Sequence, residues 1–223
     1  MIKVLAHYFT TELTLMLRNK GDWIPVLLLY SLTIALFGFS LSRESELLIR
    51  VSPVVIWVAV LFSMLTMSEL ALRKDLEEGW LSQLKLSPYP LWLFMLAKAL
   101  AYWLVLGLGF IVLLPIVSFW LYFNVSLAVG LGLVFLITTP ALILLMILAA
   151  SLTVGLPQPG LLLGLLLLPL YTPILILGQS AVATLQLMQK PMFECALLAA
   201  ISIVCALFLP FLCSLTLQQT SEE

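Results

Sequence analysis

Residues 52–104 read SPVVIWVAVLFSMLTMSELALRKDLEEGWLSQLKLSPYPLWLFMLAKALAYWL, and they decide the fold class. An apolar run ends near Ser68, a charged stretch follows, and a second apolar run continues beyond Leu104. A helix needs roughly 17 to 25 mostly apolar residues to cross a bilayer. The stretch therefore predicts two membrane-spanning helices joined by a polar segment.

The whole chain repeats this pattern. Of its 223 residues, 63% are hydrophobic and 9% are charged, whereas soluble domains average about 25% charged and under 50% apolar residues. We expect an all-α, polytopic membrane bundle of about six spans, forming a single domain over residues 1–223. The expected spans are about 23–41, 52–68, 99–123, 126–153, 161–178 and 194–217. A net charge of −1 without a basic stripe argues against nucleic-acid binding.

Prolines predict several helix boundaries. Ser52 is expected to cap the second span, with Pro53 at its first helical position, and Pro25 is expected in the first turn of the first span. Pro169 and Pro173 predict that the fifth span is kinked or divided. Because they free backbone carbonyls that neighbouring helices must satisfy, we expect this span to be buried in protein.

Residues 1–20 are typical of an amphipathic helix lying in the headgroup plane. The apolar residues of one side are Ile2, Leu5, Phe9, Leu13 and Met16. The polar residues of another side are Lys3, His7, Thr10, Thr14 and Arg18. Two interpretations remain open for this helix, a plain membrane anchor or an elbow that contacts a partner.

The distribution of basic residues predicts the orientation, because cytoplasmic loops carry an excess of Lys and Arg. With the N-terminus inside, seven lie on the cytoplasmic side: Lys3, Arg18, Lys20, Arg73, Lys74, Lys85 and Lys98. Three lie on the other side: Arg43, Arg50 and Lys190. Both termini and the charged segment are therefore expected in the cytoplasm.

The sequence offers no constellation typical of a catalytic, metal or cofactor site. It contains neither H-E-x-x-H, G-x-S-x-G nor a phosphate-binding G-x-x-x-x-G-K-[ST] loop. Lys98 and Glu194 lie at span ends, where snorkelling towards water explains a charge. The cysteines are interpreted as small apolar fillers of the last span; they are Cys195, Cys205 and Cys213. We therefore expect a non-catalytic membrane protein whose energy comes from elsewhere.

The charged segment, residues 69–90, has an internal design. Glu69 and Arg73 are spaced as an i, i+4 ion pair, Gly79 suits a left-handed helix end, and Pro90 is placed to start the next helix. The apolar residues of the segment are Leu72, Leu76, Trp80, Leu81, Leu84 and Leu86. One interpretation is a solvated loop that satisfies the positive-inside rule. The other is a coupling helix that docks into a groove of a soluble protein, which the tryptophan and leucines favour.

Arg73 to Leu104 resembles the D-x-x-[DE]-G-[ST]-L-E-x-L-x-L-x-P-x-P…A-K stretch of the haem exporter protein B (CcmB) family. RVSPVVIWV from Arg50 and LTVGLPQPGLLLGLLLLPLYTPILI from Leu152 resemble two further family patterns, so the resemblance covers nearly the whole chain. The central motif is shared more loosely with ABC-2 exporters. The departures from the pattern are Trp80, Ser82, Pro157 and Gln158.

The resemblance implies the permease subunit of a cytochrome c maturation ABC complex in the bacterial inner membrane. Two copies would pair and receive ATP-hydrolysing, CcmA-like subunits, with CcmC-, CcmD- and CcmE-like proteins as further partners. Haem would be cargo, or ATP hydrolysis would release the haem-loaded chaperone; the chain itself would bind no cofactor. The residues carried over to ATPase docking are Arg73, Asp75, Glu78, Gly79, Leu81, Leu84, Pro88 and Pro90.

Three alternatives stay open beside this hypothesis. The first is an ABC-2 permease that exports a lipid, polysaccharide or drug. The second is a stand-alone membrane enzyme or secondary carrier, which would need intramembrane acids or histidines. The third is a membrane scaffold without transport activity. For a permease, we expect ATPase closure to push residues 73–90 and to tilt the second and third spans.

Overall fold

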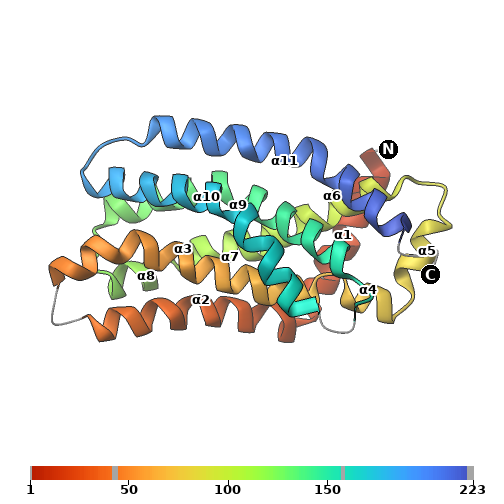
Figure 1. Ribbon diagram of the computed structural model, residues 1–223, viewed down its shortest axis with the longest axis horizontal. Coiled ribbons are helices and arrows are strands. Elements are labelled where there is room, and N and C mark those ends of the chain that lie inside the picture. The colour runs from red at the N-terminus through yellow and green to blue at the C-terminus, as the bar shows by residue number, and fades with distance from the viewer. Residues whose placement is uncertain (1, 42–44, 157–158, 220–223) are drawn as a thin grey trace.

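The computed structural model describes residues 2–41, 45–156 and 159–219, which form a bundle of helices (Figure 1). The elements are α1 (Ile2–Arg18), α2 (Lys20–Ser40), α3 (Ser45–Leu70), α4 (Arg73–Glu77), α5 (Trp80–Lys85), α6 (Leu91–Tyr102), the π-helix η1 (Trp103–Gly107), α7 (Leu108–Val112), α8 (Leu114–Trp120), α9 (Val125–Thr153), α10 (Pro159–Gln186) and α11 (Met192–Gln219). Within the described ranges there is no β-strand. The all-α class is confirmed. Arg43, Pro157 and Gln158 lie outside the described residues.

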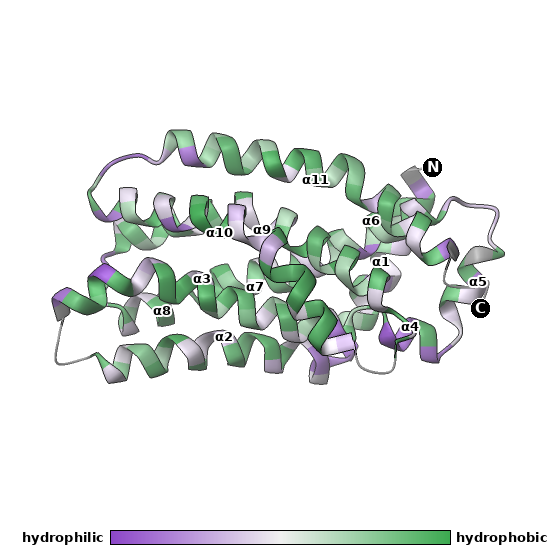
Figure 2. Ribbon diagram, in the orientation of Figure 1, coloured by the Kyte–Doolittle hydropathy of each residue, from purple (hydrophilic) through white to green (hydrophobic). Residues whose placement is uncertain are grey.

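Six stretches of the described chain are long and apolar enough to cross a bilayer. They are Lys20–Ser40, Glu46–Glu77, Leu91–Trp120, Val125–Thr153, Pro159–Gln186 and Met192–Gln218. The predicted number of spans is therefore confirmed, and the chain is a multi-pass membrane protein. In Figure 2 these helices are mostly green, and hydrophilic residues gather towards the two ends of the bundle.

The core of the bundle is built around α9. This helix is the most buried of the six spans, and it packs against α3, α6, α10 and α11. Phe135 of α9 lies at the centre of an aromatic cluster, with ring centroids 5.3 Å from Trp57 and 6.4 Å from both Tyr30 and Phe110. Edge-to-face contacts of this kind add to the apolar packing. The spans α2, α10 and α11 are the least buried of the six.

The second span begins earlier than predicted. Ser52 and Pro53 lie inside α3, which starts at Ser45, so the prediction that Ser52 caps the helix is wrong. A proline removes the hydrogen bond to the carbonyl four residues earlier. That carbonyl, of Ile49, accepts hydrogen bonds from the Ser52 hydroxyl at 2.8 Å and the Gln186 amide at 2.9 Å. Because these side chains replace the lost bond, the helix continues through Pro53. Pro25 likewise lies inside α2, beyond its first turn.

The third span starts at Leu91, directly after the extended backbone of Pro90, and not near residue 99 as predicted. It widens into the π-helix η1 and is interrupted again at Leu113, shortly before Pro115. Gly107 ends the π-helix where a Cβ atom would lie 2.9 Å from the Trp103 ring and 3.1 Å from the Thr139 hydroxyl. The irregular turn therefore allows α9 to lie close to η1. Trp103 of η1 donates a hydrogen bond to Thr139 of α9 at 3.1 Å.

The fifth span, α10, is one helix that contains both Pro169 and Pro173, and Figure 1 shows that it bends along its course. The predicted kink is thus confirmed. The expected burial is not found within this chain, because only seven residues of α10 are buried and both prolines are exposed. The helix contacts α9 through a buried stripe in which the Tyr171 hydroxyl donates to the Leu142 carbonyl at 2.9 Å.

The connections sort to two ends of the bundle. α4, α5, the start of α1 and the end of α11 lie at one end, on the right in Figure 1. The connection between α10 and α11 lies at the other end. There Glu194, which the sequence places at a span end, accepts hydrogen bonds from Ser180 at 3.2 Å and Thr184 at 3.0 Å. The polar segment predicted from residues 69–90 is therefore at the end where the chain begins.

Candidate functional site

The segment between the second and third spans folds as two short helices joined by Gly79. The φ angle of Gly79 is 71°, in the left-handed region that favours glycine. Its N–H donates to the Leu76 carbonyl at 3.1 Å, while the Glu78 N–H donates to the Lys74 carbonyl at 2.9 Å. These bonds satisfy carbonyls at the end of α4. The left-handed conformation predicted for Gly79 is confirmed.

One side of the segment is exposed. Leu76 is 41% exposed, Leu86 is 88% exposed and Tyr89 is 46% exposed. Of the polar and proline residues that share this exposure, we group five with them: Arg73, Glu77, Glu78, Pro88 and Pro90. We call these eight residues the outward face. Large apolar side chains in a charged, exposed segment are typical of a surface that a partner covers.

The other side of the segment is buried within the chain. Leu72 is 1% exposed, Leu81 is 3% exposed and Leu84 is 5% exposed, and all three belong to the hydrophobic core. Trp80 is half-buried and packs against the same core. Leu81 and Leu84, which the resemblance assigned to docking, are therefore unavailable to a partner in this conformation. Their position instead fixes the segment to the bundle.

A buried ion cluster lies directly beneath the segment. The Lys98 ammonium, on α6, donates to Glu12 of α1 at 2.9 Å and pairs with Asp75 of α4 at 2.8 Å. The side chain of Lys98 is 3% exposed and that of Glu12 is 5% exposed. The ammonium also lies 5.4 Å from the Phe94 ring and 5.5 Å from the Tyr102 ring, within cation–π range. The expectation that Lys98 snorkels is wrong, because two carboxylates reach it inside the protein.

Burial shapes the electrostatics of this cluster. Desolvation raises the pKa of the Glu12 carboxyl; Lys98 opposes the rise, whereas Asp75 adds to it. One ammonium faces two carboxylates, so the cluster carries an excess of negative charge when both are ionised. Asp75, assigned to docking by the resemblance, is turned towards Lys98 and has a side chain that is 15% exposed.

Two further ion pairs surround the cluster. The Lys74 ammonium, on α4, donates to Asp22 of α2 at 2.5 Å, with side chains 45% and 25% exposed. Arg73 donates to Glu77 at 2.8 Å on the outward face. The predicted pairing of Arg73 with Glu69 is therefore wrong. The exposed pairs contribute little to stability compared with a buried cluster.

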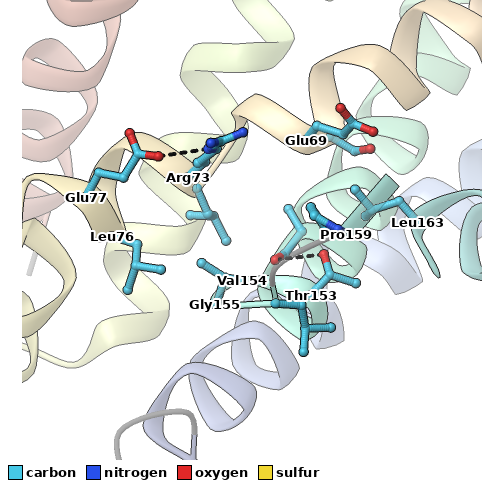
Figure 3. A pocket seen from close by; sticks show the side chains of 13 residues that line it. Glu69, Arg73, Leu76, Glu77, Thr153, Val154, Gly155, Pro159 and Leu163 are labelled. Atoms are coloured by element: carbon cyan, nitrogen blue, oxygen red, sulfur yellow. Dashed lines mark hydrogen bonds and ion pairs between the residues drawn. The ribbon is translucent and has the colours of Figure 1, made fainter. Parts of the chain in front are cut away.

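A cavity of about 240 Å³ separates α4 from the connection between α9 and α10. Figure 3 shows Arg73, Leu76 and Glu77 on one side of it and Val154 and Gly155 on the other. Glu69 and Leu163 line its inner end. α4 is thus linked to α1, α2 and α6 by ion pairs, but faces open space towards α9 and α10.

Sequence reasoning missed most of this cluster. Lys98 stood out as a charge in an apolar run, but Glu12 lies 86 residues away from it and Asp75 looked like a surface residue. The packing of α1 along α6 brings Glu12 to Lys98, and α4 adds Asp75. Within the described part of the chain, no group of three or more His, Cys, Asp or Glu residues is placed to hold a metal ion.

Comparison with known proteins settles the family. The family described as CcmB protein matches residues 3–220. The chain therefore belongs to the CcmB family. Relatives named Heme exporter protein B include those of Pseudomonas aeruginosa, 41% identical over 187 residues (83% of this chain and 84% of that protein), and Haemophilus influenzae, 34% identical over 208 residues (93% and 94%). That of Escherichia coli (strain K12) is 38% identical over 173 residues (78% and 79%). The membership in the CcmB family that the sequence motifs predicted is therefore confirmed.

Proposed function

We propose that this chain is the membrane permease subunit of an ABC transporter complex for cytochrome c maturation. A partner subunit hydrolyses ATP, and the chain couples that hydrolysis to haem export or to release of a haem-loaded chaperone. The observation that carries the proposal is the CcmB match over residues 3–220, together with relatives named Heme exporter protein B. An ABC-2 permease with a lipid, polysaccharide or drug as cargo is the alternative, and those names favour haem.

The proposed complex contains a CcmA-like ATPase, CcmC-, CcmD- and CcmE-like proteins, and two copies of this chain. Residues 1–223 act as one permease domain in the inner membrane, with α1 at the interface and both termini in the cytoplasm. The excess of Lys and Arg at the end that carries α4 and α5 supports this orientation. The ATPase therefore approaches the segment of residues 69–90.

The ATPase docks on the outward face of this segment. Of the residues carried over from the family, Arg73, Glu78, Pro88 and Pro90 belong to this face. Leu76, Leu86 and Tyr89 supply its apolar anchors. Gly79, Leu81 and Leu84 shape the segment from within, so that it offers the outward face in one conformation.

Purification of the tagged chain in mild detergent tests the proposal. We expect a soluble ATPase and a haem-linked chaperone to co-purify with the unaltered chain. Leu86→Asp is expected to reduce the recovered ATPase at least about tenfold, which corresponds to about 1.4 kcal/mol. Leu187→Asp, at a position of the opposite end that is 71% exposed, is the matched control and should retain the ATPase. Recovery of the unaltered chain without any ATPase would contradict the proposed function.

A further inference from the structure

The helix α4, on which the proposed ATPase acts, is attached to the bundle chiefly by charged side chains. None of the five residues of α4 is itself buried, although Leu72 before it and Leu81 and Leu84 after it pack in the core. Its described side-chain links to the rest of the bundle are two ion pairs, Asp75 with Lys98 and Lys74 with Asp22. Only the first is deeply buried. Among the described side chains of α4, Asp75 therefore makes the one deeply buried link, to Lys98, through which a movement of α4 reaches α6.

Lys98 connects α4 to two further helices, α6 and α1. Its backbone belongs to α6, and its ammonium holds Asp75 of α4 at 2.8 Å and Glu12 of α1 at 2.9 Å. A buried charge that loses its partner carries a large desolvation penalty. Moving Asp75 away while Lys98 and Glu12 stay in place would incur that penalty. The three groups are therefore expected to move together.

We propose that Lys98 is a positioning residue that makes α1 part of the moving unit, so that α1, α4 and α6 shift as one body when the partner displaces α4. The inference rests on the proposed function, because the ATPase supplies the force. The cavity of about 240 Å³ between α4 and the α9–α10 connection leaves room for α4 to move relative to that connection (Figure 3). The N-terminal helix is then a working element as well as an anchor.

The isolated chain tests the linkage without any partner. Glu12→Met and Asp75→Asn each leave Lys98 with one carboxylate, whereas the double variant leaves it with none. Hydrogen–deuterium exchange of the intact chain in lipid nanodiscs reports the opening of α1 and α4. Each single variant raises the exchange rates of α1 and α4 by some factor. We expect the factor for the double variant to exceed the product of the two single factors at least about fivefold. Effects that simply multiply would overturn the linkage, whether or not an ATPase binds.

The assembled complex tests the motion. Exchange in α1 is compared with and without a non-hydrolysable ATP analogue, within each variant. We expect a nucleotide-dependent change in α1 of the unaltered complex, and its loss in Glu12→Met, which keeps the balanced pair of Lys98 and Asp75. Lys74→Met, which breaks the exposed pair with Asp22, is the matched control and should keep the change. An ATP-dependent change in α1 that persists in Glu12→Met, or that is absent from the unaltered complex, would overturn the proposal. Failure of the ATPase to bind the unaltered chain would instead contradict the proposed function.

Discussion

Lys98 stabilises the folded chain only while carboxylates surround it. Its ammonium is buried among Glu12, Asp75 and two aromatic rings. Removing one partner of a buried ion pair typically costs about 3–5 kcal/mol, whereas replacing the whole group by well-packed apolar side chains of similar volume is often neutral or stabilising. The charge balance of the cluster therefore matters more than any one of its residues.

Replacing all three charged side chains should restore stability that the loss of Lys98 alone removes. Lys98→Met leaves two buried carboxylates without a cation and should lower the free energy of unfolding by about 3–5 kcal/mol. The triple variant with Glu12→Met, Asp75→Leu and Lys98→Met has only apolar side chains in the cluster and should recover most of that loss. The free energy is measured by SDS titration of the purified chain. A triple variant less stable than Lys98→Met would show that the charges are not the cause.

The close packing of two helices can require a small residue where one helix meets a large side chain of the other. Gly178 of α10 faces the Trp57 ring of α3 so closely that an added Cβ atom would collide with it, whereas a Cβ on Gly164 of the same helix would lie 4.0 Å from the Leu65 side chain. Overpacking of this kind costs about 1–3 kcal/mol. Gly178→Ala should therefore destabilise the chain by this amount, while Gly164→Ala should leave it unchanged or more stable. Thermal unfolding in detergent distinguishes the two, and equal midpoints would contradict the packing.

At this scale the sequence predicts the number of spans better than their boundaries. Apolar runs of sufficient length fix six crossings because water-free lipid leaves the backbone few alternatives. The early start of α3 depends on Gln186, a residue 137 positions from Ile49, which satisfies the carbonyl freed by Pro53. The burial of Lys98 depends on α1, which no local pattern places beside α6. Long-range contacts of this kind explain why the segment was predictable but its buried ion cluster was not.

The orientation of the whole molecule is open to direct measurement. Pro88→Cys and Lys190→Cys place single thiols at exposed positions of opposite ends, in a background whose native cysteines are replaced by alanine. Because the basic residues gather at the end of Pro88, we expect a membrane-impermeant maleimide to label Lys190→Cys in intact spheroplasts and Pro88→Cys only in inverted vesicles. The reverse pattern would contradict the orientation.

For the whole molecule, we propose that the segment of residues 69–90 receives an ATPase from the cytoplasm. Site-specific photo-cross-linking tests it most directly, with a photoreactive residue in place of Leu86, which is 88% exposed on the outward face. Phe119 of α8, 76% exposed at the opposite end, is the matched control. The account predicts a cross-link from position 86 to a soluble ATP-hydrolysing subunit and none from position 119. An ATPase cross-linked at position 119, or absent from position 86 while the complex is intact, would contradict it.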